Sequence, residues 1–211
     1  MTFRSWIVRL YFLNGAFACA YIATAFFTIP SYLLNRIFNM DGEGTLCSWY
    51  SSAMLLFSAL CWALQLEVIR RPVERYLAAV TALSLTVLSI DESVSVHESA
   101  SIKLQNATQS PFELTGPVFL AAIPVLILGI AVWRLWPWPG RPAALLFGGA
   151  ALMVGSACGF EMLANSFVYN SPMYKLEVLL EETGEMMGMT TILLGSYDHL
   201  KQRFARPVEI G

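Results

Sequence analysis

Charged side chains are scarce in this chain of 211 residues, and their scarcity indicates its class. Lys, Arg, Asp and Glu together make up 13% of the sequence, whereas hydrophobic residues make up 56%. Ordinary soluble domains carry about 25% charged residues, so the composition favours one polytopic membrane domain over one or two soluble domains. The net charge of −2, with no basic stripe, excludes nucleic acid as the expected partner. Membrane lipid is the partner that the composition indicates.

Cysteine pairs and histidines are also few. The 4 cysteines include no C-x-x-C pair and fall in separate apolar runs, which indicates buried free thiols rather than a disulfide framework. The only 2 histidines, His97 and His199, are expected on opposite faces of the membrane. A haem held by both histidines is therefore excluded, and neither haem nor a nucleotide is expected as a cofactor.

Six apolar segments are each close to the ~20 residues that a helix needs to cross a bilayer. They cover residues 11–33, 46–69, 76–102, 118–136, 143–168 and 174–197. The first follows a basic start and lacks a clean small-residue cleavage site, so we interpret it as a retained span. We predict an all-α fold, a polytopic membrane bundle of six transmembrane helices in a single integral membrane domain. The alternative is five spans, with the first segment lying in the membrane interface.

The distribution of Lys and Arg predicts the orientation of the bundle. Of the 13 basic residues, only Arg36, Lys103 and Lys175 belong to the side opposite the N-terminus. All the others lie on the side of the N-terminus, the even-numbered turns and the C-terminal tail. Because cytoplasmic loops carry an excess of Lys and Arg, we predict that both termini are cytoplasmic.

Ionisable residues interrupt three of the predicted spans. In the third span an apolar run leads into Asp91, Glu92, His97 and Glu98, where an unpaired charge would cost several kcal/mol. The fifth and sixth spans contribute Glu161, Glu177, Glu181, Glu182 and Glu185. At about 1.5 Å per residue, Asp91, Glu161 and Glu185 lie roughly 15–18 Å below the outer ends of their helices. The inner halves of these spans contain no acids, so the sequence predicts an acidic chamber in the outer half of the bilayer.

The carboxylates also group by helix face. At about 100° per residue, Asp91 and Glu98 share one stripe of the third span, and Glu181 and Glu185 share one stripe of the sixth. His97 points about 100° away from Glu98. It joins the cluster only if the helix is distorted there; otherwise it faces a different neighbour, as a helix-end histidine bonded to a carbonyl or to a partner subunit would.

Eight acids near one low-dielectric space cannot all be ionised, because like charges and desolvation both raise carboxyl pKa values. Either several acids are protonated, or a divalent cation supplies the missing positive charge. Carboxylates with a histidine suit Fe, Mn or Zn, whereas carboxylates alone suit Mg, Ca or Mn. We therefore expect a divalent metal ion, Fe, Mn or Zn, as the cofactor. The candidate metal ligands are Asp91, Glu92, His97, Glu98, Glu161, Glu181, Glu182 and Glu185.

Other interpretations of these residues stay open. The acids can instead form a protonated or hydrogen-bonded network between helices, or a path for protons or cations. Glu98 and Glu177 can also be interfacial surface groups. No Glu-x-x-His pair is present, so a ferritin-like di-iron site is incomplete. Methionines near the acids would suit copper, but methionine more often fills gaps in a core. We interpret Gly184-x-x-x-Gly188 as a site of close helix packing.

Two motifs carry a resemblance to known sequences. They are Asp91-Glu92-x-x-x-x-His97-Glu98 and Glu181-Glu182-x-x-Glu185-Met186. Together they resemble the spans of a set of uncharacterised multi-pass bacterial membrane proteins, which carry a D-E-x4-H-E span and, near the C-terminus, an E-E-x2-E-M span. The likeness covers mainly the third to sixth spans. It implies a multi-pass protein of the bacterial inner (plasma) membrane, and it implies no activity.

The sequence therefore favours an integral membrane protein with a buried, carboxylate-rich, metal-binding site that opens toward the outer side. If the protein is an enzyme, an acid or a metal-activated water at that depth would act on a lipid-like or quinone-like substrate, by hydrolysis or by oxidation. One alternative is a proton- or cation-coupled transporter. Another is a structural subunit of a membrane complex, whose acids bind a membrane-protein partner or a second copy of the chain.

Overall fold

The computed structural model describes residues 3–27, 31–42, 44–94, 129, 140–164 and 166–205. Within these ranges the chain is helical and contains no strand, which confirms the predicted all-α class. The helices are α1 (Phe3–Phe26), α2 (Tyr32–Ile37), α3 (Leu46–Gln65), α4 (Pro72–Val94), α7 (Gly140–Ala164) and α8 (Pro172–Ala205). The predicted span 118–136, apart from helical Gly129, and the outer end of the predicted span 76–102 lie outside the described residues.

Four of these helices are long and apolar enough to cross a membrane. The apolar stretches are Val8–Phe26, Leu46–Gln65, Pro72–Val94 and Gly140–Phe160. Helix α8 is the longest of the described helices, with 34 residues, and its polar residues keep it out of that group. At 1.5 Å per residue it is about 50 Å long, which exceeds the roughly 30 Å of a hydrocarbon core. The chain thus fits an integral membrane protein.

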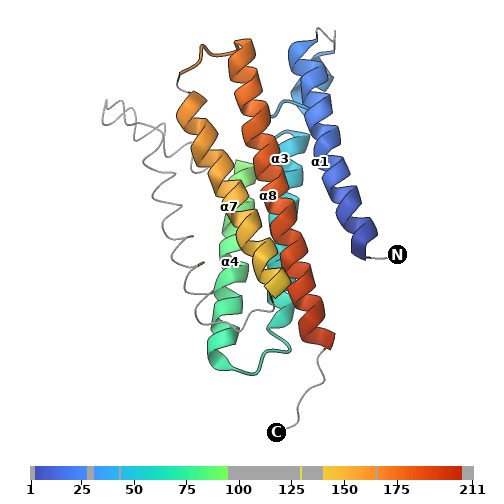
Figure 1. Ribbon diagram of the computed structural model, residues 1–211, viewed down its shortest axis with the longest axis vertical. Helices are drawn as coiled ribbons and strands as arrows, with labels where there is room; N and C mark the ends of the chain where they lie inside the picture. Colours follow the sequence, from blue (N-terminus) through green and yellow to red (C-terminus); the bar gives the residue numbers. More distant parts are fainter. Residues whose placement is uncertain are drawn as a thin grey trace, which may run out of the picture.

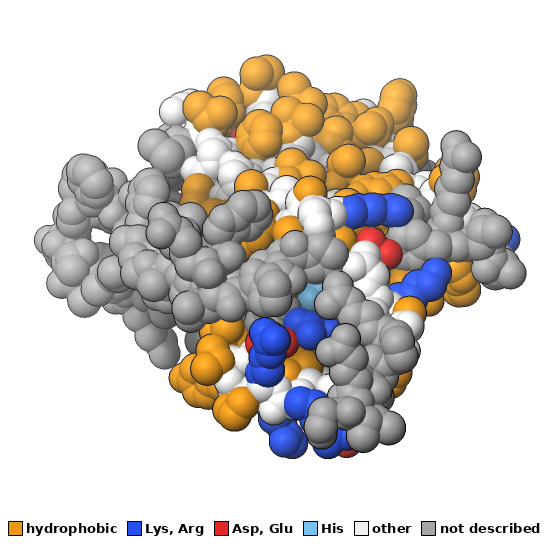
Figure 2. All heavy atoms as spheres, turned by 60° about the horizontal axis from the view of Figure 1, so that its bottom comes forward, with side chains coloured by type: hydrophobic (Ala, Val, Ile, Leu, Met, Phe, Trp, Pro, Cys, Tyr) orange, Lys and Arg blue, Asp and Glu red, His pale blue; other side chains and the backbone are white. Residues whose placement is uncertain are grey.

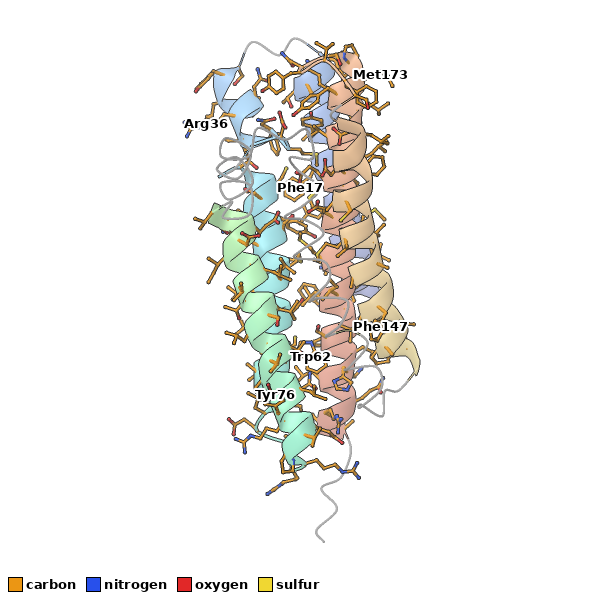
Figure 3. All side chains as sticks on the ribbon, turned by 90° about the vertical axis from the view of Figure 1, so that its left-hand side faces the viewer. Phe17, Arg36, Trp62, Tyr76, Phe147 and Met173 are labelled. Atoms are coloured by element: carbon orange, nitrogen blue, oxygen red, sulfur yellow. The ribbon has the colours of Figure 1, made fainter. Side chains whose placement is uncertain are left out.

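Helix α8 lies at the centre of the described bundle. It packs against α7 on one side and against α3 and α1 on the other, while α4 packs against α3 (Figure 1). The Lys175 amine reaches Ala25 and the Tyr11 hydroxyl reaches Thr191, so α1 runs antiparallel to α8. We call the end where α1 and α4 finish and α3 and α8 begin the outer end, and the opposite one the inner end. Arg36 and Met173 lie at the outer end in Figure 3, and Tyr76 lies toward the inner end.

Hydroxyl side chains define the starts of three helices at the outer end. Ser31 begins α2 by accepting a hydrogen bond from the Leu34 amide at 3.3 Å. Thr45 begins α3 with a capping box, in which Thr45 and Ser48 exchange side-chain and backbone hydrogen bonds. The Ser171 hydroxyl accepts from the Tyr174 amide at 3.2 Å and begins α8. Because Ser31 starts a separate helix, the first long helix ends at Phe26 and not at residue 33, and it begins at Phe3, before the start of the predicted span 11–33.

Helices α7 and α8 touch through their backbones. A Cβ atom added to Gly188 would lie 2.7 Å from the carbonyl oxygen of Gly149 and 2.6 Å from the amide nitrogen of Met153. A Cβ added to Gly184 would overlap the Ser156 hydroxyl. Only residues without a side chain fit at these positions. The interpretation of Gly184 and Gly188 as a packing motif is therefore confirmed.

A small polar centre lies inside the apolar core between α1, α3 and α8. Asn14 donates to the Thr190 hydroxyl at 3.1 Å, and the Tyr50 hydroxyl lies 3.2 Å from the same oxygen. Phe17 packs on the Tyr50 ring with the centroids 5.1 Å apart. Toward the inner end the core continues with Trp62, which is fully buried (Figure 3). The core thus aligns α3 with α8 at two depths.

Candidate functional site

Two contacts fix the register of α3 along α8. The Trp62 indole donates to the Ser196 hydroxyl at 3.1 Å, and His199 Nδ1 lies 2.6 Å from the Gln65 side-chain oxygen. Both contacts join residues 134 positions apart, so the two helices run parallel with a constant offset. The same offset places Cys47 of α3 level with the acids at the outer end of α8.

Hydroxyl contacts likewise fix the depth of Asp91 on α4. Ser52 donates to the Ser89 carbonyl at 2.7 Å and accepts from the Ser93 hydroxyl at 2.8 Å. Asp91 lies between Ser89 and Ser93, so it is level with Ser52 and hence with the part of α8 that contains Glu185. The described helices therefore place Asp91 and Glu185 at a common depth. Asp91 lies on α4, which packs against α3, and whether it shares a site with Glu185 stays a prediction.

The position of Glu161 along α7 follows from the packing of α7 on α8. Ser156 faces Gly184, and the two helices run antiparallel. Glu161, further toward the outer end, is then level with the stretch of α8 between Glu177 and Glu181. The side chain of Glu161 lies outside the described residues, as do His97 and Glu98.

Glu177 is the most deeply buried of the described acids at the outer end. Only 4% of its surface is exposed, so the interpretation of Glu177 as an interfacial surface group is wrong. Neither of its carboxylate oxygens has a hydrogen-bond partner among the described residues. Glu181, one turn further along α8, and Asp41 lie close enough to interact with it electrostatically. The Glu177–Glu181 pair does not reach hydrogen-bond geometry.

Glu182, a neighbouring acid of α8, lies close to residues of both α1 and α3. Glu182 interacts electrostatically with the Tyr21 hydroxyl of α1 and with the Cys47 thiol of α3. Both of these residues are buried. Each predicted ligand whose side chain is described takes part in at least one polar or electrostatic interaction; these are Asp91, Glu92, Glu181, Glu182 and Glu185.

The described part of the chain holds no group of three or more His, Cys, Asp or Glu side chains arranged to bind a metal ion. Three predicted ligands, His97, Glu98 and Glu161, fall outside the side chains that the structure describes. The described residues thus contain only part of the predicted ligand set, and that set stays a prediction.

Asp41 lies just outside the bundle, in the segment between α2 and α3, and faces the start of α8. It accepts a hydrogen bond of 2.7 Å from the Tyr174 hydroxyl. The pKa of Asp41 is raised above its ordinary value, because surrounding atoms exclude water from part of the carboxyl group; the Tyr174 hydrogen bond opposes the rise. Asp41 and Glu177 together make the outer end of α8 electronegative.

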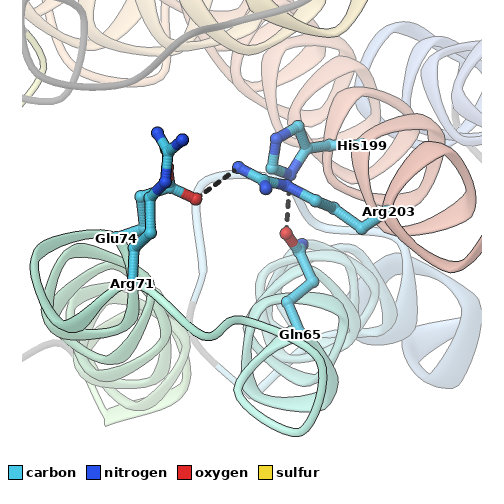
Figure 4. Close-up of polar contacts among 5 residues, drawn as sticks. All are labelled: Gln65, Arg71, Glu74, His199 and Arg203. Carbon is cyan, nitrogen blue, oxygen red and sulfur yellow. Dashed lines mark hydrogen bonds and ion pairs between the residues drawn. The ribbon is translucent and has the colours of Figure 1, made fainter. Parts of the chain in front are cut away.

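A second polar network lies at the inner end, where α3 and α8 finish (Figure 4). His199 is 1% exposed, and its ring stacks on Trp62 with the centroids 5.1 Å apart. The side-chain oxygen of Gln65 only accepts hydrogen bonds, so His199 Nδ1 is the donor in that pair. Trp62 in turn donates to Ser196. The network fixes both the rotamer and the tautomer of the histidine.

Ion pairs surround this network. Arg203 of α8 lies 3.0 Å from the Glu74 carboxylate of α4, and Arg71 lies 3.3 Å from it (Figure 4). Arg141, at the start of α7, lies 3.8 Å from Asp198. Figure 2, which looks toward this end, shows Lys and Arg side chains gathered here. The ion pairs join the inner ends of α4, α7 and α8.

The burial of these inner groups is not evident from the sequence. Glu74, Asp198 and His199 lie just beyond the predicted spans 76–102 and 174–197, yet all three are buried. A usable signal was Trp62 and Gln65 near the end of an apolar run, because buried Trp and Gln side chains require hydrogen-bond partners. Nothing in a single sequence shows that those partners are Ser196 and His199.

Comparison with known proteins gives one relationship. No curated protein and no solved structure matches the chain. A family model does match, from the middle of α1 to the inner end of α8, and it includes both the outer acids and the inner histidine network. The matching residues are 13–199, and the chain belongs to the family described as Domain of unknown function (DUF8692).

Proposed function

We propose that this protein binds a divalent cation in the outer half of a membrane, between α8 and the helices that carry the other predicted ligands. The observation that supports the proposal most is Glu177, whose two carboxylate oxygens are buried and have no hydrogen-bond partner among the described residues. A buried, unpaired carboxylate is costly unless a proton or a cation neutralises it. Asp41 lies nearby and adds negative charge, which favours a cation.

The proposed ligand set joins Glu177 to the acids predicted from the sequence. Glu181, Glu182 and Glu185 share α8 with it, Asp91 lies at the depth of Glu185, and Glu161 is level with Glu181 along α7. With His97 in reach the site would suit Fe, Mn or Zn; without it, carboxylates alone would suit Mg or Mn. A metal-activated water at this depth would reach lipid-like or quinone-like substrates, in the inner membrane of a bacterium.

Elemental analysis tests this proposal directly. We expect protein purified in detergent to contain near-stoichiometric metal, and we expect Glu177→Gln, Asp91→Asn and Glu185→Gln to lower that content. Glu67→Gln is the matched control, because Glu67 is an exposed acid beyond α3 at the inner end. Adding the metal back to stripped protein should raise the melting temperature of the wild type, by an amount equivalent to about 2.7 kcal/mol at a hundredfold excess over Kd. A purified protein that contains no metal, and whose melting temperature does not change when metal is added, would contradict the proposal.

A second function, proton or cation transfer along α8, is favoured by the inner network. The inner halves of the predicted spans contain no acids, but Glu74, Asp198 and His199 are buried just beyond them, at the inner end of the bundle. Asn14 and Thr190 form a polar centre between this network and the outer acids. Polar groups thus occur at several depths along α8, as a proton relay requires.

Reconstituted vesicles distinguish the two functions. Transfer predicts a proton flux driven by a pH gradient, which His199→Gln should reduce at least tenfold while leaving the metal content unchanged. A cation site without transfer predicts no flux above that of empty vesicles. Flux that persists in His199→Gln contradicts a path through the inner network.

A further inference from the structure

The outer end of the bundle contains an open cavity that lies apart from the buried acids of α8. Its volume is about 320 Å³, within the range of small-molecule sites. The described residues that line it come from α1, from α2 and the segment after it, from the turn between α7 and α8, and from the first turn of α8. Its polar and aromatic lining includes Tyr21, Asn39, Asp41, Tyr169, Tyr174 and Lys175.

The turn before α8 builds the aromatic wall of this cavity. Asn170 has a φ of 63°, a left-handed conformation that Asn tolerates better than most residues. Ser171 then caps α8 through the Tyr174 amide. This arrangement brings the rings of Tyr169 and Tyr174 to 5.1 Å between centroids, tilted by 58°. The two rings therefore form a fixed corner rather than two independent surface side chains.

The charges around the cavity favour a positively charged occupant. Asp41 lines it directly, and Asp41, Glu177 and Glu182 all act electrostatically on the Tyr21 hydroxyl at its inner wall. Lys175 is the lining cation, but its amine donates to the Ala25 carbonyl at 2.9 Å. Ala25 belongs to the last turn of α1, so Lys175 caps that helix and interacts with its negative end.

We propose that this cavity binds a small organic ammonium cation, held between the tyrosine rings and the Asp41 carboxylate. Aromatic faces attract such cations, and a carboxylate completes the recognition of the charge. A strongly hydrated metal ion gains little from tyrosine faces, so this ligand differs in class from the cation proposed for the buried acids. The ammonium group can belong to a free solute or to the headgroup of a membrane lipid.

Choline is a suitable probe, and titration calorimetry on the full-length protein in detergent measures its binding. We expect the wild type to bind choline. Asp41→Asn keeps an acceptor for the Tyr174 hydroxyl but removes the charge, and Tyr169→Leu removes one aromatic face. Each variant should weaken choline binding about tenfold or more, because each loses an interaction worth roughly 1–2 kcal/mol. Tyr32→Leu is the control, since Tyr32 is an exposed tyrosine at the same end. No choline binding at millimolar concentration, or equal binding by Asp41→Asn, would overturn the proposal.

Lipid nanodiscs identify the source of the ammonium group. If a lipid headgroup fills the cavity, choline should bind in phosphatidylglycerol discs and be excluded from phosphatidylcholine discs. If the ligand is a free solute, choline should bind equally in both. The metal content of Tyr169→Leu should match that of the wild type, because Tyr169 lines the cavity but carries no charge near the buried acids. Failure of the ammonium site and failure of the buried cation site therefore give different results.

Discussion

At the scale of single residues, His199 and Gln65 depend on each other. Gln65→Leu would leave the buried Nδ1–H of His199 without its acceptor, and such a loss costs about 1–3 kcal/mol. Replacing both residues by Leu removes the polar pair altogether. The double variant should therefore lose less free energy of unfolding than the two single variants lose together. Equilibrium unfolding in mixed micelles measures this coupling. Strictly additive effects would show that the hydrogen bond contributes nothing.

Asp41 should make the stability of the protein depend on pH in an unusual direction. Its pKa is raised in the folded protein, so its protonated form is favoured by folding. The corresponding stability is present below the unfolded pKa and is lost as the pH rises through the folded pKa. Asp41→Asn should therefore raise the melting temperature at pH 7 and leave it unchanged at pH 3. A destabilising effect at pH 7 would mean that the ionised carboxylate has a partner that stabilises it.

Removing the buried charge of Glu177 should also stabilise the protein when no cation is bound. In metal-stripped protein, Glu177→Gln removes the need to bury a charge and should raise the melting temperature. In metal-loaded protein the same substitution should lower it, because a ligand is lost. The change of sign between the two conditions is the expected result, and melting curves with and without chelator measure it. The same sign in both conditions would contradict a role for Glu177 in cation binding.

At the scale of helices, the contact of α7 with α8 should be the most sensitive to small additions. A Cβ on Gly149 would lie 2.7 Å from the Gly188 carbonyl oxygen, whereas a Cβ on Gly148 meets no atom of the described structure within 4 Å. We expect Gly149→Ala to destabilise the protein by about 1–3 kcal/mol, because the helices must separate. Gly148→Ala should be neutral or slightly stabilising. Thermal unfolding of this adjacent pair gives a matched comparison, and equal effects would contradict the backbone contact.

The helices show why some features were predictable from the sequence and others were not. Small residues at Gly184 and Gly188 predicted close packing, because space at a helix surface depends mainly on local residue size. The burial of Glu177 was not predictable, because it depends on α1 and the segment before α3, which fold over the start of α8. The pairing of Glu74 with Arg203 joins helices far apart in sequence. Whether a segment forms a helix depends mainly on its local sequence, whereas which side chains pair between helices depends on the tertiary structure.

At the scale of the whole molecule, the described helices constrain the path of the chain. Helix α4 runs from the inner to the outer end, and α7 begins at the inner end, where Arg141 meets Asp198. The chain therefore leaves one helix at the outer end and enters the next at the inner end. The predicted span 118–136 would join these two ends with one crossing, and it stays a prediction.

Reporter fusions test this topology. The inner end carries Arg71, Arg141 and Arg203, so by the positive-inside rule it should face the cytoplasm. Alkaline phosphatase, which is active only outside, should be active when fused after Asn106 and inactive after Gly140. Green fluorescent protein, which becomes fluorescent only in the cytoplasm, should show the reverse. The C-terminal fusion after Gly211 should behave like the one after Gly140, because α8 returns the chain to the inner end. Phosphatase activity after both Asn106 and Gly140 would show that the chain does not cross the membrane between α4 and α7. That result would rule out the six-span topology.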